Sequence, residues 1–169
     1  MTAIAASRHT FGDGVSAGLD TLHRMRAIVL EQIASPVVRQ TAAGICHGTG
    51  KNSDYQIHLL RTWLQSHVNF LRDPAGHELL HTPELMLMLL SQQGALDVDC
   101  DDVAMLAAAL GMSIGLRAQF VMIGAEGGYS HIWTELAAPV DGADWQELDI
   151  TRPFQVDLSQ YPMQFTMEV

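Results

Sequence analysis

The chain has 169 residues, of which 48% are hydrophobic, and it carries a formal net charge of −10. This length suits a single domain with a sizeable core, and the acidic balance argues against binding to a nucleic-acid backbone. No apolar run is long enough to span a bilayer, and the N-terminal region lacks the apolar segment of a secretory signal. We therefore expect a cytoplasmic protein that does not insert into membranes.

The two cysteines, Cys46 and Cys100, are too few for a disulfide framework. A buried or catalytic thiol is more natural in a reducing compartment. Cys46, His47 and His58 lack the paired spacing of a zinc site, so we predict neither a metal nor another cofactor.

The first half of the chain has mainly helical patterns. Residues 1–15 are small and polar, and we predict a flexible N-terminal arm there, followed by one domain over residues 16–169. Ser35-Pro36 has the pattern of an N-cap followed by proline at the first helical position, and Ser53 is predicted to cap the third helix. The four predicted helices cover residues 16–34, 36–45, 53–68 and 82–91, with a turn at 73–76.

After residue 100 the periodicity changes from helical to alternating. A helix is predicted from Cys100 to Gly111, where glycine suits the left-handed C-terminal position. Apolar runs joined by glycine-rich turns then predict strands over residues 116–123, 129–137 and 145–150. Helices followed by an antiparallel sheet predict an α+β domain, with the N-terminal helices packed on the C-terminal sheet.

One cysteine, Cys100, stands at the start of this Ala- and Leu-rich helix. A helix N-terminus favours the thiolate, which is the reactive form of cysteine, through its partial positive charge. Nearby carboxylates would disfavour a thiolate, and we expect them to cap the helix or to face away; they are Asp97, Asp99, Asp101 and Asp102. The alternative interpretation is that Cys100 is a small buried hydrophobic residue.

A histidine and an aspartate follow in the predicted strands. Alternation places Tyr129, His131 and Trp133 on one face of their strand, and Trp133 is expected to pack beneath the site. Asp149 follows the apolar Leu148 in the next predicted strand. Each residue alone has an ordinary structural explanation. Together a thiol, a base and an orienting acid occur in the order that cysteine acyl transfer requires.

The combination of motifs resembles the transglutaminase-like superfamily, which has a papain-type fold with a cysteine at a helix N-terminus. The resemblance rests on Cys100-Asp101-Asp102 opening a helix, then residues 130–135, then residues 145–151, within a core of about 94–152. The spacings from the cysteine to the histidine and from the histidine to the aspartate are 31 and 18 residues.

An upstream segment extends this resemblance. Residues 68–84 are similar to the region before the cysteine in short phage- or prophage-encoded transglutaminase-like cysteine peptidases. Two positions depart from the family pattern: Asp99 stands where glycine is usual, and His81 stands where such phage proteins often have glutamine. We expect Asp99 to crowd the thiol or to lower its thiolate fraction.

The resemblance implies a mechanism and three catalytic residues. Cys100 would attack a carboxamide or peptide carbonyl, His131 would carry the thiol proton to the departing amine, and Asp149 would orient the imidazole. The oxyanion would be met by the backbone N–H of the cysteine and one further donor, for which Gln92 and Gln93 are candidates. Release of the thioester by water or by an amine stays open.

The predicted function is therefore that of a cysteine peptidase or amidase that is encoded by a phage or prophage. We expect a peptide or protein substrate, and a cell-wall peptide is the favoured one. We also expect the protein to associate with components of the phage particle. The alternative is a non-catalytic virion structural, assembly or binding protein that retains the fold. A host housekeeping peptidase is a third possibility.

Overall fold

The computed structural model describes residues 6–9, 15–71, 78–125, 128–151 and 161–169. Its elements are, in chain order, β1 (Ala6–His9), α1 (Val15–Gln32), α2 (Pro36–Ile45), α3 (Ser53–His67), β2 (Val68–Phe70), β3 (Glu78–His81), α4 (Pro83–Gln93), β4 (Leu96–Val98), α5 (Cys100–Ser113), β5 (Arg117–Ala125), β6 (Gly128–Ala137), β7 (Gln146–Leu148) and β8 (Met163–Glu168). The predicted turn at 73–76 lies outside the described residues.

A four-stranded antiparallel sheet follows the helices, in the order β7-β6-β5-β8. The predicted α+β class, with N-terminal helices and a C-terminal antiparallel sheet, is confirmed. Three of these strands were predicted, whereas β8 was not. Two further pairs of short strands, β1 with β3 and β2 with β4, were also missed.

The N-terminal arm predicted over residues 1–15 is partly a strand. Ala6–His9 forms β1 and pairs antiparallel with Glu78–His81, so this stretch gains backbone hydrogen bonds that its small and polar composition did not indicate. Residues 1–5 and 10–14 of the predicted arm lie outside the described part of the chain.

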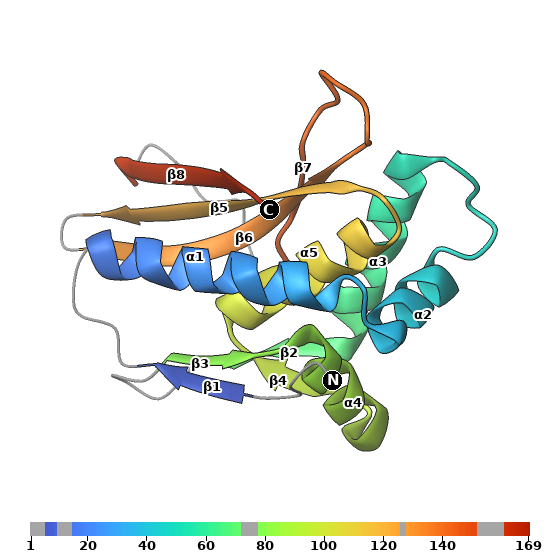
Figure 1. Ribbon diagram of the computed structural model, residues 1–169, viewed down its shortest axis with the longest axis horizontal. Coiled ribbons are helices and arrows are strands. Elements are labelled where there is room, and N and C mark those ends of the chain that lie inside the picture. The colour runs from blue at the N-terminus through green and yellow to red at the C-terminus, as the bar shows by residue number, and fades with distance from the viewer. Residues whose placement is uncertain (1–5, 10–14, 72–77, 126–127, 152–160) are drawn as a thin grey trace.

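The elements are arranged in layers around α5 (Figure 1). Helices α1 and α5 lie between the four-stranded sheet and a second group that contains β1, β3, β2, β4 and α4. Helices α2 and α3 close one end of this arrangement. None of the helices in the described part of the chain is long and apolar enough to cross a membrane.

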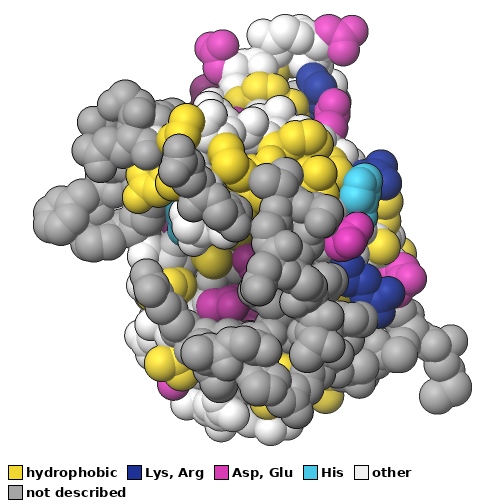
Figure 2. Space-filling view, turned by 90° about the vertical axis from the view of Figure 1, so that its left-hand side faces the viewer, with side chains coloured by type: hydrophobic (Ala, Val, Ile, Leu, Met, Phe, Trp, Pro, Cys, Tyr) yellow, Lys and Arg dark blue, Asp and Glu magenta, His cyan; other side chains and the backbone are white. Residues whose placement is uncertain are grey.

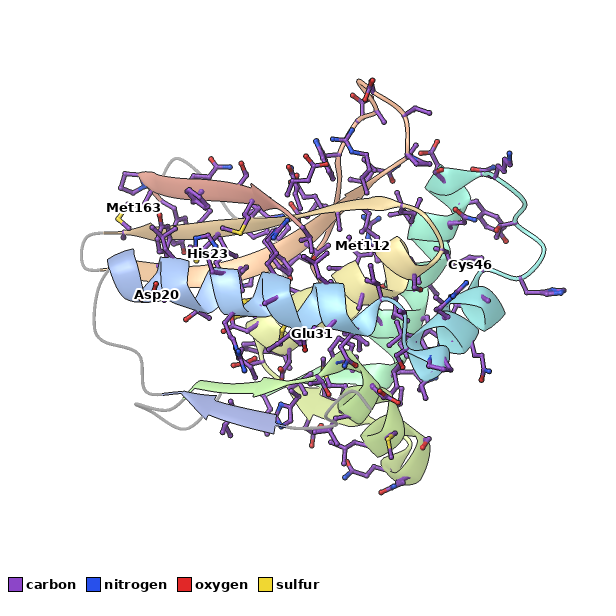
Figure 3. The ribbon with its side chains drawn as sticks, in the orientation of Figure 1. Asp20, His23, Glu31, Cys46, Met112 and Met163 are labelled. Atoms are coloured by element: carbon purple, nitrogen blue, oxygen red, sulfur yellow. The ribbon has the colours of Figure 1, made fainter. Side chains whose placement is uncertain are left out.

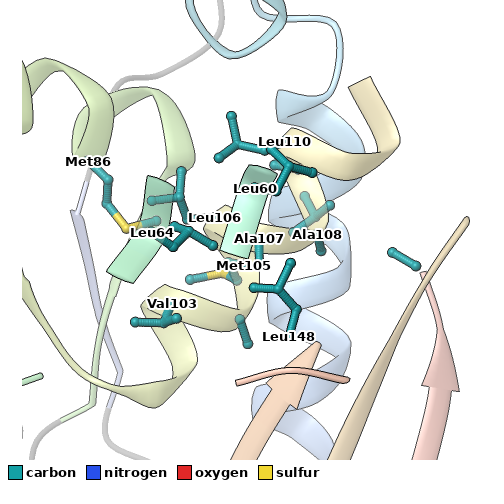
Figure 4. Packing of buried hydrophobic residues seen from close by; sticks show 14 of the residues in the cluster. Leu60, Leu64, Met86, Val103, Met105, Leu106, Ala107, Ala108, Leu110 and Leu148 are labelled. Atoms are coloured by element: carbon teal, nitrogen blue, oxygen red, sulfur yellow. The ribbon is translucent and has the colours of Figure 1, made fainter. Parts of the chain in front are cut away.

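Helix α5 is the centre of the hydrophobic core. Every residue from Asp101 to Gly111 is buried, because this helix contacts all four other helices and the strands β5 and β6. Its alanines allow those neighbours to approach closely. Figure 4 shows how its side chains meet Leu60 and Leu64 of α3, Met86 of α4 and Leu148 of β7.

The starts of α2 and α3 differ from the expected capping in two details. Pro36 begins α2 as predicted, although the Ser35 side chain makes no capping hydrogen bond. The predicted cap of α3 was Ser53, but Asn52 is the N-cap, and its side chain accepts a hydrogen bond from the Tyr55 N–H at 3.1 Å. Asparagine and serine are about equally good caps, so composition alone does not choose between adjacent positions.

The predicted end of α5 at Gly111 is also wrong. Gly111 lies inside the helix, and the residue with the left-handed backbone conformation is Gly115, with φ +94°. The reason for glycine at position 111 is space, since a Cβ there would lie 2.7 Å from Leu136 Cδ2 on β6. Gly111 therefore permits the close packing of the central helix on the sheet.

We expect Gly111→Ala to destabilise the protein by about 1–2 kcal/mol, because overpacking outweighs the better helix propensity of alanine. Gly44→Ala is a matched control on α2, where a Cβ would meet nothing within 4 Å. Urea unfolding should show the control to be as stable as the wild type or more so. Equal stability of the two variants would contradict this account of the α5–β6 contact.

Candidate active site

Strand β6 carries His131 next to an irregularity in the sheet. Ile123 pairs with His131 and Gly124 pairs with Tyr129, so Ser130 is an extra residue between two pairs and forms a β-bulge. The predicted alternation therefore fails at one position. His131 and Trp133 share a face, whereas Tyr129 turns to the main core, and its ring lies against Gly18 of α1.

His131 is held by two neighbours. Its Nε2 lies 2.6 Å from Oδ2 of Asp149, and its ring stacks on Trp133 with the centroids 5.7 Å apart. The Asp149 side chain is only 2% exposed, and that of His131 is 15% exposed. Because Nε2 contacts Asp149, Nδ1 is the ring nitrogen that is left to exchange a proton.

The carboxylate of Asp149 is kept ionised by its hydrogen bonds. Burial alone would raise its pKa, but the hydrogen bond and charge of His131 and the donors of Thr151 outweigh this effect and lower the pKa to about 2. The N–H and the hydroxyl of Thr151 each lie 2.8 Å from Oδ1. Asp149 is therefore fixed as an acceptor for the imidazole.

This lowered pKa predicts a dependence of stability on pH. The folded pKa of Asp149 lies near 2 and the ordinary value is 3.8, so the contribution is present above about pH 4 and is lost as the pH falls towards 2. Asp149→Asn should remove about 2 kcal/mol of this pH-dependent stability. Urea unfolding at both ends of the range measures it, with the exposed Asp141→Asn as control. Parallel losses in the wild type and Asp149→Asn would contradict the assignment.

Cys100 is the first residue of α5. Asp99 is the N-cap, and its side chain accepts a hydrogen bond from the Asp102 N–H at 3.3 Å. As the first helical residue, Cys100 has a backbone N–H that the helix itself leaves without a partner. The thiol is half-buried and lies beside the strand that carries His131, with the N–H of Ile132 hydrogen-bonding to it.

The expectation of a thiolate in the free protein is not supported. Burial raises the pKa of the Cys100 thiol, and the charges of Asp101 and Asp99 raise it further, which outweighs the hydrogen bond from Ile132. The acidic neighbours were expected to cap the helix or face away. Asp99 does cap it, but Asp101 lies against the thiol, with Sγ 3.5 Å from Oδ1.

Cys100 and His131 line one cavity of about 140 Å³, which is small beside the roughly 300–1,000 Å³ of typical small-molecule sites. No hydrogen bond joins these two described side chains. Figure 2 views the molecule from the side on which α1 begins, and it shows a hollow with acidic and hydrophobic side chains at its floor. The cavity therefore has room for a single side chain or amide group rather than a large ligand.

Helix α1 supplies part of the cavity wall, which the sequence did not indicate. Its contribution comes from one helix face, at Gly18, Thr21, Leu22 and Met25. These positions recur at helical spacing, so the pattern identified a buried face but not what the face covers. The opposite walls come from β5 and β6, through Met122, Tyr129, Ser130 and Ile132.

The two candidate oxyanion donors predicted from the sequence do not line this cavity. Gln92 and Gln93 are exposed at the end of α4, and neither is among the described residues that line the cavity. The backbone N–H groups of Cys100 and Ile132 are better placed, because one begins α5 and the other reaches the thiol.

The second cysteine lies apart from this cavity. Cys46 is the C-cap of α2, it is 8% exposed, and its thiol donates to the Gln56 carbonyl at 3.8 Å. Figure 3 places it at the end of the molecule formed by α2 and α3. Among the described residues, no three His, Cys, Asp or Glu side chains gather as metal ligands would.

No family model matches the chain, and no curated protein matches it significantly. The transglutaminase-like resemblance therefore stays a prediction from its motifs.

Proposed function

We propose that this protein is a cysteine hydrolase, a peptidase or amidase of the transglutaminase-like type, which acts by acyl transfer through Cys100. The observation that carries this proposal is the arrangement of three residues. A cysteine begins a buried helix, and it shares a small cavity with a histidine whose Nε2 is bound by a buried, ionised aspartate. A thiol nucleophile, its base and an orienting acid have to share one site, and the hydrogen bond between Cys100 and His131 that the reaction needs would form when the substrate binds.

The chemistry follows from the protonation states. Because the Cys100 thiol is protonated in the free protein, its proton has to leave during attack on the carbonyl carbon. His131 Nδ1 takes that proton while Asp149 stabilises the imidazolium, and the S–C bond forms as the carbonyl becomes an oxyanion. The imidazolium then protonates the departing amine, which leaves a thioester. Water attacks the thioester with His131 as base, releases the acid and restores the thiol.

The substrate is a peptide or an amide whose acyl part enters a narrow cavity. The cavity volume and its apolar walls from Leu22, Met25 and Met122 favour a small or extended acyl group. A peptide of the bacterial cell wall is our favoured substrate, in an enzyme encoded by a phage or prophage and either cytoplasmic or carried on the virion. If the purified protein never associates with phage particles, the phage setting is rejected but the proposed acyl-transfer reaction is not.

A second function is favoured by a different observation. Asp101 lies against the thiol, the Cys100 pKa is raised, and no hydrogen bond joins Cys100 to His131. These features suit a binding or structural module, such as a virion assembly protein, that retains the fold without turnover. The two functions differ in whether Cys100 forms a covalent acyl intermediate.

Acylation of Cys100 tests the choice between them. The protein is mixed with a panel of nitrophenyl esters of acylated amino acids, and peptide mass spectrometry locates the acyl group. We expect acylation of Cys100 in the wild type and in Cys46→Ala, and none in Cys100→Ala. Cys46→Ala is the matched control because it removes the other thiol, which lies outside the cavity. Wild-type protein that stays unmodified by every ester would favour the non-catalytic module.

A further inference from the structure

Three alternate residues on one face of β6 each contact a residue of α5. The contacts join the N–H of Ile132 to the thiol of Cys100, the hydroxyl of Thr134 to the carbonyl of Ala104 at 2.7 Å, and the side chain of Leu136 to Gly111. On α5 these residues are spaced four and seven apart, so they form one stripe along the helix. The helix that begins with the proposed nucleophile therefore lies along the strand that carries the proposed base.

The first two contacts have matching spacings on the two elements. From Cys100 to Ala104 a helix advances about 6 Å, and from Ile132 to Thr134 a strand advances about 6.7 Å. Because the two advances are nearly equal, both contacts form together when the helix lies at this position along the strand. The contact at Thr134 therefore sets where the thiol lies beside the Ile132 N–H, one residue from the proposed base.

The hydroxyl of Thr134 stands in apolar surroundings. Thr134 is fully buried, and its neighbours on the same face of β6, Ile132 and Leu136, are apolar and buried as well. The Ala104 carbonyl has a regular partner within the helix, the N–H four residues later, so it does not need the hydroxyl. A valine would fill the same space, but apolar contacts are non-directional, whereas a hydrogen bond fixes the distance and direction between two groups. The hydroxyl therefore fixes a register that packing alone would leave free to slide.

We propose that Thr134 is a positioning residue: its hydroxyl holds the first turn of α5 in register with β6, and so keeps the Cys100 thiol within reach of His131. This inference rests on the proposed acyl transfer at Cys100. The register matters for the rate because a misplacement of about 1 Å can slow a reaction about 10²-fold.

Three variants of the full-length chain separate the hydroxyl from the packing around it. Thr134→Val removes the hydroxyl and keeps the branched shape, whereas Thr134→Ser keeps the hydroxyl and removes a methyl group. Gly111→Ala disturbs the third contact, about 16 Å along the helix from Cys100, without touching the hydroxyl. Urea unfolding establishes the range of conditions in which each variant is folded, and all rates are measured within that range.

We expect Thr134→Val to slow the acylation of Cys100 about tenfold or more, measured under single-turnover conditions with the nitrophenyl ester that reacts best with the wild type. Thr134→Ser and Gly111→Ala should stay within about threefold of the wild-type rate, because both keep the hydrogen bond, although both lose stability. Rates that follow stability, or equal slowing in Thr134→Val and Thr134→Ser, would overturn the proposal, because the hydroxyl would then not be what positions the thiol.

Alkylation gives a second readout, which does not need acyl transfer. The Ile132 N–H favours the thiolate of Cys100, so a helix that slides away from it makes the thiol harder to ionise. We expect iodoacetamide at about pH 8 to alkylate Cys100 about tenfold more slowly in Thr134→Val, as for a rise of about one unit in the thiol pKa, and at nearly the wild-type rate in Thr134→Ser. The titratable groups beside the thiol are the same in every variant, and they are Asp99, Asp101 and His131.

The two readouts distinguish a failure of this inference from a failure of the proposed function. If alkylation follows the expected pattern in a protein whose Cys100 is never acylated, Thr134 positions the thiol but the hydrolase is rejected. If Cys100 is acylated and Thr134→Val reacts at the wild-type rate in both assays, the hydrolase stands and the role of Thr134 is overturned.

Discussion

His131→Ala is expected to slow the acylation of Cys100 by about 10²–10⁴-fold, which is the usual contribution of a positioned general base. The effect is large because the thiol pKa is raised in the free protein, so the uncatalysed reaction has little thiolate to use. The measurement is the rate at which one acyl group appears on Cys100 under single-turnover conditions with the best ester of the panel.

His67→Ala is a matched control for this variant. His67 stacks on Trp63 with the ring centroids 4.6 Å apart, as His131 stacks on Trp133, but it lies on α3 and is not among the described residues that line the cavity. Cys100 in the His67→Ala variant should be acylated at the wild-type rate. Equal acylation rates in His131→Ala and His67→Ala would contradict the role of His131 as the general base.

Asp101→Asn is expected to make the Cys100 thiol more reactive, in contrast to His131→Ala. Alkylation of Cys100 should become faster by about tenfold or more. The Asp101 carboxylate lies 3.5 Å from Sγ and accepts a hydrogen bond from the thiol, so it stabilises the thiol against the thiolate. An asparagine removes this charge, and its amide can donate to the thiolate instead. The rate is measured with iodoacetamide over a range of pH.

Asp97→Asn serves as the control for Asp101→Asn. Asp97 is exposed and accepts a hydrogen bond from Asn69 at 3.0 Å, so its charge is screened by water and lies outside the first turn of α5. Cys100 in the Asp97→Asn variant should be alkylated at the wild-type rate. Slower alkylation in Asp101→Asn than in the wild type would mean that Asp101 helps the thiol to ionise, contrary to the geometry.

The elements that the sequence predicted well are those whose pattern is local. Pro36 fixes the first turn of α2, and Thr82 with Pro83 fixes that of α4, where the Thr82 hydroxyl accepts from the Leu85 N–H. Strands β5 and β6 are long and rich in apolar residues, so their pattern is also clear. These features depend on neighbours a few residues away, which a sequence displays directly.

The missed strands depend on partners far along the chain. β1 and β3 are each four residues long, and β2 pairs in parallel with β4 across an intervening helix. β8 alternates between half-buried and exposed residues, and its place beside β5 is set by the sheet. Strands this short are stabilised mainly by their pairing, and intrinsic preference gives little signal.

The site was predictable in its residue types and order but not in its geometry. The sequence identified Cys100, His131 and Asp149, and the structure joins the last two by a hydrogen bond and places the first at the same cavity. The bulge at Ser130, the turn of Asp101 towards the thiol and the contact between His81 and Asp102 depend on packing between distant segments. No spacing rule encodes these contacts.

The most direct test of the account is the pH dependence of Cys100 acylation in the wild type and in His131→Ala, measured side by side. If the ring accepts the thiol proton, the wild-type rate rises through an ionisation that the variant lacks, and the variant reacts only where the thiol itself ionises, above its ordinary pKa. Two profiles that coincide over the whole range would contradict the claim that His131 activates Cys100.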